Sequence, residues 1–134
     1  MDFFPAGSRA AVRGAADRFT GTVWQDQIHS AEDPARLRAL RVFFEPGART
    51  AWHSHPLGQI LHITGGTGLV GRRNQPPQLV RAGDSIWISP TEEHWHGAAP
   101  GSCMEHIAMH EAQNGFVATW MELVSDEEYL LSPA

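Results

Sequence analysis

Histidine and glutamine side chains between Gly47 and Gly65 are the residues of this chain best suited to chemistry. His53 and His55 are two residues apart, so both imidazoles point to the same face of an extended strand. Gln59 shares that parity and offers an amide oxygen, and His94 supplies a third imidazole from a separate strand-and-turn unit. Three histidine nitrogens and one neutral oxygen predict a site for a divalent metal with open coordination positions.

The scarcity of other reactive side chains narrows the chemistry further. The chain has no lysine, which excludes a Schiff-base mechanism. Its only cysteine, Cys103, excludes an internal disulfide and a thiolate-rich zinc site. Histidine is plentiful, with eight in the chain. An enzyme built from this sequence must therefore rely on imidazole and a metal.

Length and charge limit the classes of protein that this chain can belong to. Its 134 residues suffice for one domain with a hydrophobic core. A net charge of −5 without a basic cluster argues against a nucleic-acid partner. The N-terminus lacks the pattern of a signal peptide, and no apolar run reaches bilayer length. We expect a cytoplasmic protein with a small-molecule substrate and no membrane partner.

Short alternating segments separated by Gly, Pro and Asn turns predict an all-β, antiparallel barrel. Ser125 and Glu128 have the spacing of a capping box, which predicts one short C-terminal helix. We expect a single domain, with an N-terminal arm over 1–18, the barrel over 19–124, and the helix and tail over 125–134. Strands are expected at 20–25, 36–44, 50–55, 60–64, 68–72, 78–80, 85–88, 103–110 and 119–124, with a turn at Gly65-Gly66.

The alternation of side chains along a strand assigns its inward face. If His53 and His55 point inward, His62 lies outside. Glu105 would be costly to bury without a partner, so the opposite face of its strand, which carries His106, is the inward one. The side chains expected to line a substrate pocket beside the metal are Leu40, Val42, Phe44, Leu61, Ala108 and His110.

Two segments resemble the paired motifs of the cupin superfamily. The first cupin motif has a glycine, His-x-His, a glutamate and a second glycine, and Gly47, His53, His55, Gln59 and Gly65 match these places. Gln59 departs from the usual glutamate. The resemblance implies a cupin fold, which is a jelly-roll-like barrel (a double-stranded β-helix).

The second cupin motif has a glycine, Pro-x-Gly and a histidine. Gly83 and His94 match in place, whereas six residues separate Gly83 from Pro90 and Glu92 stands where glycine is usual. Both motifs occur in the family's order and separation, which makes the resemblance specific for the fold.

A narrower resemblance is to the small bacterial manganese cupins with hydroxynitrile lyase activity. It rests on Gly-Ala-Arg-Thr-Ala-Trp-His-Ser-His-Pro-Leu-Gly-Gln and on His-Trp-His-Gly-Ala-Ala-Pro. The resemblance implies that His53, His55, Gln59 and His94 hold Mn²⁺. The donor types alone admit Fe²⁺, Ni²⁺ or Zn²⁺ as well.

The same resemblance implies that His106 is the acid/base group in cleavage and formation of cyanohydrins and, by extension, in addition of a nitronate to an aldehyde. From the residues alone, His106 either serves that cavity or is a satisfied core histidine. His96 either assists His106 or only forms hydrogen bonds with polar groups of a loop. His110 stands where some of that group carry a glutamine, so the wall of the pocket differs. Compared with the usual glutamate, the neutral Gln59 raises the net charge of the metal site by one unit. The higher charge favours binding of an anionic oxygen or of cyanide.

Other function classes stay open at the level of sequence. An open site of this kind with Fe or Mn permits a dioxygenase that uses O₂, and a non-catalytic cupin that binds a small molecule is the non-enzymatic alternative. Cupin lyases that act on sulfonium propionates match less well. They are expected to carry a tyrosine in the cavity, whereas the only tyrosine here, Tyr129, lies in the C-terminal segment.

Aromatic residues expected on the outer surface predict a homo-oligomer, either a dimer or a tetramer. Phe43 and Trp87 point outward by the same strand alternation. Arg49, Trp52 and Trp95 are also interpreted as surface or interface residues.

Overall fold

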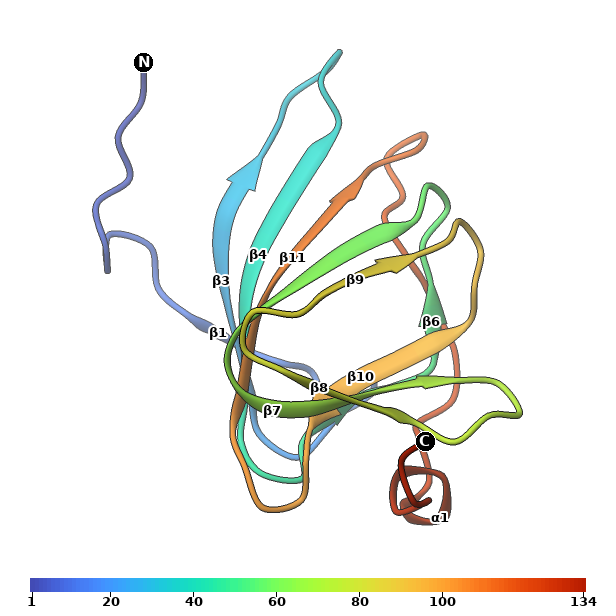
Figure 1. Cartoon of the computed structure of the whole chain (residues 1–134). Helices are drawn as coiled ribbons and strands as arrows, with labels where there is room; N and C mark the ends of the chain where they lie inside the picture. Colours follow the sequence, from blue (N-terminus) through green and yellow to red (C-terminus); the bar gives the residue numbers. More distant parts are fainter.

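A curled sheet of strands with one short helix at the C-terminal end forms the whole fold, as Figure 1 shows. The computed structural model describes residues 1–134, and none of its helical segments has the length and apolar character needed to cross a membrane. The expectation of an all-β fold with a short C-terminal helix is confirmed. The elements are β1 (Val12–Arg13), β2 (Phe19–Thr20), β3 (Val23–Ser30), β4 (Leu37–Phe44), β5 (Arg49–Thr50), β6 (His53–Ser54), β7 (Gln59–Arg72), β8 (Gln78–Arg81), β9 (Ser85–Ile88), β10 (His94–Ala98), β11 (Met104–Glu111), β12 (Thr119–Trp120) and α1 (Asp126–Tyr129).

Strand β7 joins the two sides of the barrel because it takes part in both. Its first half pairs with β9 and β11, and its second half pairs with β8 and β10. On the first side the sheet continues from β11 to β4, β3 and β1, so β1 ties part of the N-terminal segment to the barrel. On the second side β10 pairs with β5 and β6, which in turn pair with β2 and β12.

The turn expected at Gly65-Gly66 is wrong, because β7 continues through these glycines as one strand of 14 residues. Gly66 has a φ of +71°, and a Cβ there would lie 1.8 Å from the carbonyl oxygen of Cys103. Glycine therefore allows the strand to bend from one side of the barrel to the other against the start of β11. Strand β10, which carries His94, was not among the expected strands.

Burial along the strands follows the predicted alternation. On β11 the buried side chains are Met104, His106, Ala108 and His110, and the residues between them are partly exposed. On the first part of β7, Gln59, Leu61 and Ile63 are buried, and His62 is only half-buried and bonds to Ser85 on the outer face. The face of β7 that carries Gln59 and the face of β11 that carries His106 therefore both point into the barrel.

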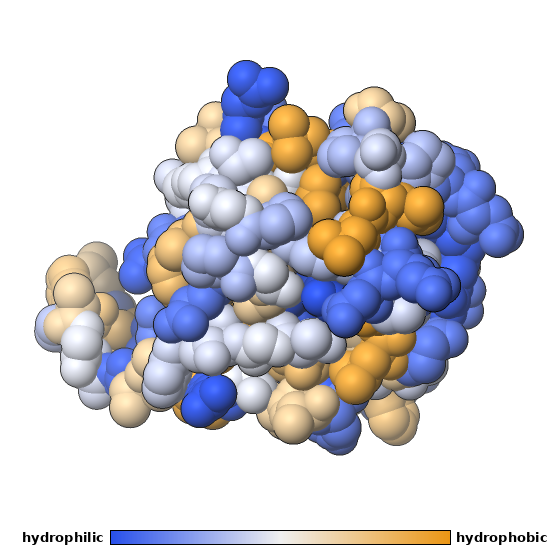
Figure 2. Space-filling view, turned by 90° about the horizontal axis from the view of Figure 1, so that it is seen from below, coloured by the Kyte–Doolittle hydropathy of each residue, from blue (hydrophilic) through white to orange (hydrophobic).

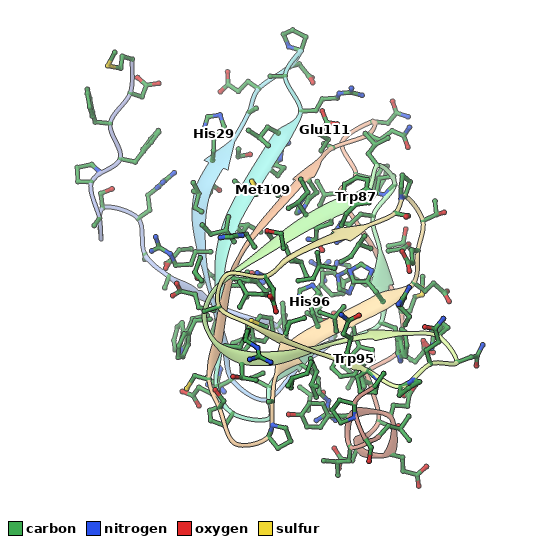
Figure 3. The ribbon with its side chains drawn as sticks, viewed as in Figure 1. His29, Trp87, Trp95, His96, Met109 and Glu111 are labelled. Carbon is green, nitrogen blue, oxygen red and sulfur yellow. The ribbon has the colours of Figure 1, made fainter.

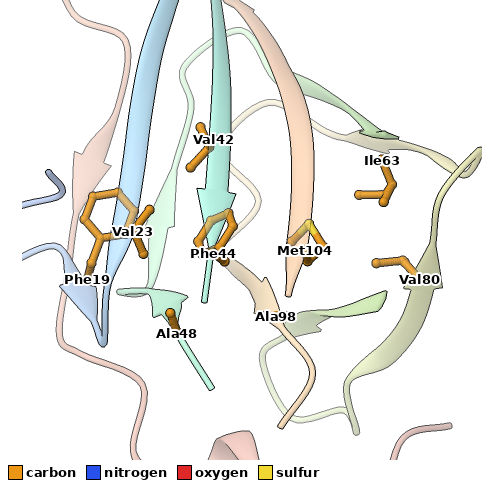
Figure 4. Close-up of a cluster of buried hydrophobic side chains, with 9 residues drawn as sticks. All are labelled: Phe19, Val23, Val42, Phe44, Ala48, Ile63, Val80, Ala98 and Met104. Atoms are coloured by element: carbon orange, nitrogen blue, oxygen red, sulfur yellow. The ribbon is translucent and has the colours of Figure 1, made fainter. Parts of the chain in front are cut away.

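The largest apolar cluster fills one end of the barrel, where β4 ends and β11 begins (Figure 4). Burial of these side chains removes apolar surface from water and closes this end. The inward histidines of β11 lie further along the strand, beyond Met104, toward the other end. The members of the cluster are Phe19, Val23, Val42, Phe44, Ala48, Ile63, Val80, Ala98 and Met104.

Helix α1 is anchored by polar groups, among them Arg49, which was expected at the surface. Its capping box of Ser125 and Glu128 forms as expected. Arg49, only 5% exposed, donates to the carbonyl oxygen of Val124 at 2.9 Å, and the Tyr129 hydroxyl donates to that of Ala98 at 2.7 Å. The C-terminal segment therefore packs as part of the barrel.

Trp52 and Trp95 are also buried, which corrects their interpretation as surface residues. They pack with Leu69, Val124 and Tyr129 in a second apolar cluster. Trp52 Nε1 donates to Glu128 in α1 at 3.1 Å, so the indole has both an apolar contact and a hydrogen-bond partner. The face of the molecule seen from below carries apolar patches between hydrophilic residues (Figure 2).

Candidate metal centre

Strands β6, β7 and β10 bring the predicted ligand residues together inside the barrel, and His55 follows directly after β6. Strand β10 pairs with β6 so that His94 lies opposite His53. The imidazole centroids of His53 and His94 are 4.2 Å apart, and those of His53 and His55 are 5.1 Å apart. Gln59 begins β7 and is 3% exposed. All four predicted ligands are therefore buried neighbours.

Backbone carbonyls fix the orientation of three of the imidazoles. The Nδ1 atoms of His53, His55 and His94 lie 2.9, 2.6 and 2.9 Å from the carbonyl oxygens of Ala51, Val117 and Glu92. A carbonyl oxygen only accepts, so each Nδ1 carries the proton and each Nε2 carries a lone pair. Metal-binding histidines are commonly held by this type of contact.

Unpartnered buried atoms show that the residues present fit a divalent cation. His55 Nε2, His94 Nε2 and Gln59 Oε1 are buried without a hydrogen-bond partner. Buried polar atoms are seldom left unpaired, and these are nitrogen and oxygen donors with available lone pairs. The donor set suits a divalent transition metal rather than Ca²⁺, which prefers oxygen ligands.

Both His55 and His96 are candidates for the third histidine ligand. His53, His94 and His96 form a group of three imidazoles whose possible ligand atoms lie within 4.8 Å of one another. His96 differs from the other two because its Nδ1 bonds to His106 Nε2 at 3.0 Å instead of to a carbonyl oxygen. His55 shares the carbonyl contact of His53 and His94, and His96 Nε2 is buried without a hydrogen-bond partner.

Burial holds these histidines neutral, as metal binding requires. Burial lowers the pKa of His94 and of His106 to about 4. It also lowers the pKa of His53 well below its usual value, with a further contribution from the charges of His94 and His55. The pKa of His96 is lowered well below its usual value by burial and by His106. Neutral imidazoles thus present lone pairs at neutral pH.

His96 and His106 form a buried imidazole pair above the apolar cluster. Phe44 lies against both rings, with centroid distances of 5.9 Å to His96 and 5.3 Å to His106. His96 Nε2 and His106 Nδ1, the outer nitrogens of the pair, have no partner. A pair with one shared proton and two free nitrogens can take up a proton at one end and pass it along.

The remaining predicted pocket residues divide between the core and the neighbourhood of the ligands. Val42, Phe44, Leu61 and Ala108 are buried, and Leu40 is half-buried beside them. His110 stacks on His55 with a centroid distance of 4.8 Å and an interplanar angle of 21°. Burial, with His55 and Arg38, lowers the pKa of His110 to about 4.

A surface cavity of about 350 Å³ reaches His94 from the side of the barrel. Its walls include Ile86, Trp87 and Ile88 of β9 and Arg72 at the end of β7. Figure 3 shows Trp87 on this strand and His96 within the barrel. Neither Arg72 nor Trp87 was among the pocket residues expected from the sequence, because strand alternation places Trp87 outside.

Two contacts from the C-terminal segment were also missed. The indole of Trp120 stacks on His53 with a centroid distance of 4.6 Å and an interplanar angle of 23°. The carbonyl oxygen of Val117 holds His55, and β12 pairs with β6, which carries His53. The only sequence signal was an aromatic residue in a predicted strand, and no local pattern links that strand to the ligands.

Comparisons with known proteins agree with this architecture. The sequence matches the family model described as Cupin domain over residues 40–107. It is 49% identical over 129 residues to an (R)-mandelonitrile lyase from Granulicella tundricola, covering 96% of this chain and 98% of that protein. The cupin fold expected from the two sequence motifs is confirmed.

Solved structures show the same similarity. A cupin-like protein from Thermotoga maritima has a TM-score of 0.84 and 41% identity, covering 96% of this chain and 95% of that one. The polyketide cyclase RemF from Streptomyces resistomycificus has a TM-score of 0.71 and 18% identity, covering 96% and 90% of the two chains. The second likeness shows the shared fold alone.

Proposed function

Because this chain belongs to the cupin family, we propose that it is a metal-dependent lyase that cleaves and forms cyanohydrins. The observation that carries the proposal is the near full-length similarity to an (R)-mandelonitrile lyase, together with buried donor atoms that lack partners. The proposed substrates are a cyanohydrin in one direction, and an aldehyde or ketone with cyanide in the other.

The proposed ligands are His53, His55, Gln59 and His94, and the proposed cation is Mn²⁺, with Fe²⁺, Ni²⁺ and Zn²⁺ as candidates to be tested. When bound, the cation would supply Lewis-acid polarisation of the substrate hydroxyl. Three neutral imidazoles and an amide leave its full charge uncompensated, which strengthens that polarisation. The proposal is supported by the carbonyl contacts that direct the Nε2 atoms inward.

His96 and His106 would move the proton. The substrate hydroxyl gives its proton to His96 Nε2, and the proton on His96 Nδ1 passes to His106 Nε2 across the 3.0 Å contact. As the carbon–carbon bond breaks, its electron pair leaves on cyanide, and a carbonyl group forms. The low pKa of His106 makes its protonated form a ready donor, so the proton returns through His96 to cyanide.

The proposed pocket favours an uncharged aryl or alkyl group. Leu40, Val42, Leu61 and Ala108 offer apolar side chains on the inward faces of their strands. An aromatic carbonyl compound is therefore the first substrate to test. By the same chemistry, a nitronate could replace cyanide as the carbon nucleophile.

Cleavage of mandelonitrile by the Mn²⁺-loaded protein tests the proposal, with release of benzaldehyde followed by absorbance. The His106→Ala variant should lose about 10²–10⁴-fold in turnover, as expected for removal of an acid/base group. The exposed His29 provides a matched control, since His29→Ala should retain activity. Equal turnover by wild type and His106→Ala would refute the assignment. Turnover that stops without O₂ would favour the dioxygenase alternative.

The proposed homo-oligomer rests on apolar side chains on the outer face of the sheet that contains β3, β7 and β9. Trp87 is 59% exposed, and Ile60 and Trp24 are each 40% exposed. Apolar surface of this kind is often covered by another subunit. Light scattering coupled to size-exclusion chromatography measures the mass directly, and a monomer at micromolar concentration would refute this part of the proposal.

A further inference from the structure

We propose that His110 is a positioning residue that fixes the orientation of the Gln59 amide, so that Oε1 rather than Nε2 faces the metal centre. This inference rests on the metal centre proposed above. It assigns His110 a role in assembling the centre, beyond its expected place in the pocket wall.

The contact between the two side chains is built into the sheet. His110 on β11 lies directly opposite Gln59 on β7 in the register of the two strands. Gln59 Nε2 lies 3.3 Å from His110 Nδ1, and both residues are buried. Gln59 Oε1 is buried and has no hydrogen-bond partner. The NH₂ group of the Gln59 amide therefore contacts His110, and its carbonyl oxygen stays free to bind a cation.

Orientation matters because the two ends of a primary amide differ chemically. The oxygen carries lone pairs that a cation accepts, whereas the NH₂ group carries only donors. A flipped amide would direct N–H groups at the cation and remove one ligand. The glutamate usual at this place in cupins has two equivalent oxygens and needs no such control. A neutral amide ligand thus requires a neighbour that distinguishes its two ends.

His110 Nδ1 can supply that distinction. A neutral imidazole with a lone pair on Nδ1 accepts from the Gln59 NH₂ group but offers nothing to its oxygen. Arg38 lies opposite His110 on β4. Its guanidinium group has donors only, so it cannot replace His110 as the acceptor. His110 also stacks on His55, so a packing role must be separated from the hydrogen-bonding role.

Two substitutions separate these roles. His110→Phe keeps an aromatic ring against His55 but removes the acceptor, and His110→Gln restores an acceptor without the ring. Metal-free protein is titrated with Mn²⁺ alone, and binding and the zero-field splitting of the bound ion are followed by EPR. We expect His110→Phe to weaken Mn²⁺ binding by about 10–100-fold, as for other partners of metal ligands, and to change the spectrum. His110→Gln should bind nearly as well as wild type.

A double-mutant cycle with Gln59→Glu provides the decisive comparison. Since a carboxylate presents an oxygen in either orientation, His110→Phe should cost much less affinity in the Gln59→Glu background. A packing role predicts the same loss in both backgrounds and would overturn the inference. His62→Phe, the same change on the outer face of β7, should leave Mn²⁺ binding unchanged, and thermal unfolding of each metal-free variant verifies its fold.

The outcomes separate this inference from the metal centre on which it rests. Failure of the wild type to bind Mn²⁺ would overturn both. Tight Mn²⁺ binding by wild type and by His110→Phe, with unchanged EPR spectra, would overturn the role of His110 alone.

Discussion

Acidification should strongly destabilise the metal-free protein between pH 6.5 and 4. Six buried histidines have a lowered pKa, and for His94, His106 and His110 the value is about 4 against 6.5 for an ordinary histidine. In this pH window the unfolded chain binds protons that the folded chain does not. The free energy of unfolding therefore falls as the pH falls through the window, and it is fully retained above pH 6.5.

The three histidines with a pKa of about 4 set the magnitude. The pKa of each of these histidines is about 4 in the folded protein against 6.5 in the unfolded chain. Each one therefore lowers the free energy of unfolding by about 2 kcal/mol at pH 5 relative to pH 7, and the three together lower it by about 6 kcal/mol. A whole domain is typically stable by only about 5–15 kcal/mol. The metal-free protein should thus be close to unfolding at pH 5.

Urea unfolding of the metal-free protein at pH 7 and pH 5, followed by tryptophan fluorescence, measures this loss. The His106→Asn variant should show a pH dependence smaller by about 2 kcal/mol, since one of the three groups is removed. His29→Asn, at an exposed position, should behave as wild type. Equal unfolding free energies at both pH values, or a full pH dependence in His106→Asn, would refute the reasoning.

Three further substitutions test how the fold supports the site. Trp120→Leu removes the ring stacked on His53 and should weaken Mn²⁺ binding by about tenfold, measured by titration of the metal-free protein; unchanged affinity would contradict a positioning role. Tyr129→Phe removes the hydrogen bond to the Ala98 carbonyl oxygen and should lower the free energy of unfolding by about 1 kcal/mol, measured by urea denaturation. Gly66→Ala places a Cβ 1.8 Å from a backbone oxygen at positive φ, so we expect misfolded protein by circular dichroism; a native spectrum would show that β7 can shift.

Local sequence patterns were sufficient for the part of the site carried by single strands. The spacing of His53, His55 and Gln59 predicted that these side chains lie together. In the structure a turn at residues 56–57 separates His55 from β7, so Gln59 is placed by the pairing of β7 and not by alternation along one strand. His106 was placed inward because its neighbour Glu105 is costly to bury. The capping box at Ser125 likewise depends only on residues close in sequence.

The same local patterns could not predict contacts between segments that are distant in the sequence. Arg49 looks like a surface residue in isolation, yet the carbonyl oxygen of Val124 and the ring of Tyr129 accommodate its guanidinium group in the interior. Gly65-Gly66 reads as a turn, but both glycines pair with β11, which holds them in β7. The orienting contacts of Val117 and Trp120 depend on tertiary structure, so no periodicity in their own segment could predict them.

The late position of Val117 and Trp120 in the chain has a consequence for biosynthesis. The ribosome makes all four proposed ligands before it makes the segment that orients His53 and His55. A nascent chain that stops before this segment has the ligands but lacks the Val117 carbonyl oxygen that orients His55 and the indole that stacks on His53. Loading with the cation is therefore expected only after Val117 and Trp120 have left the ribosome and β12 has paired with β6.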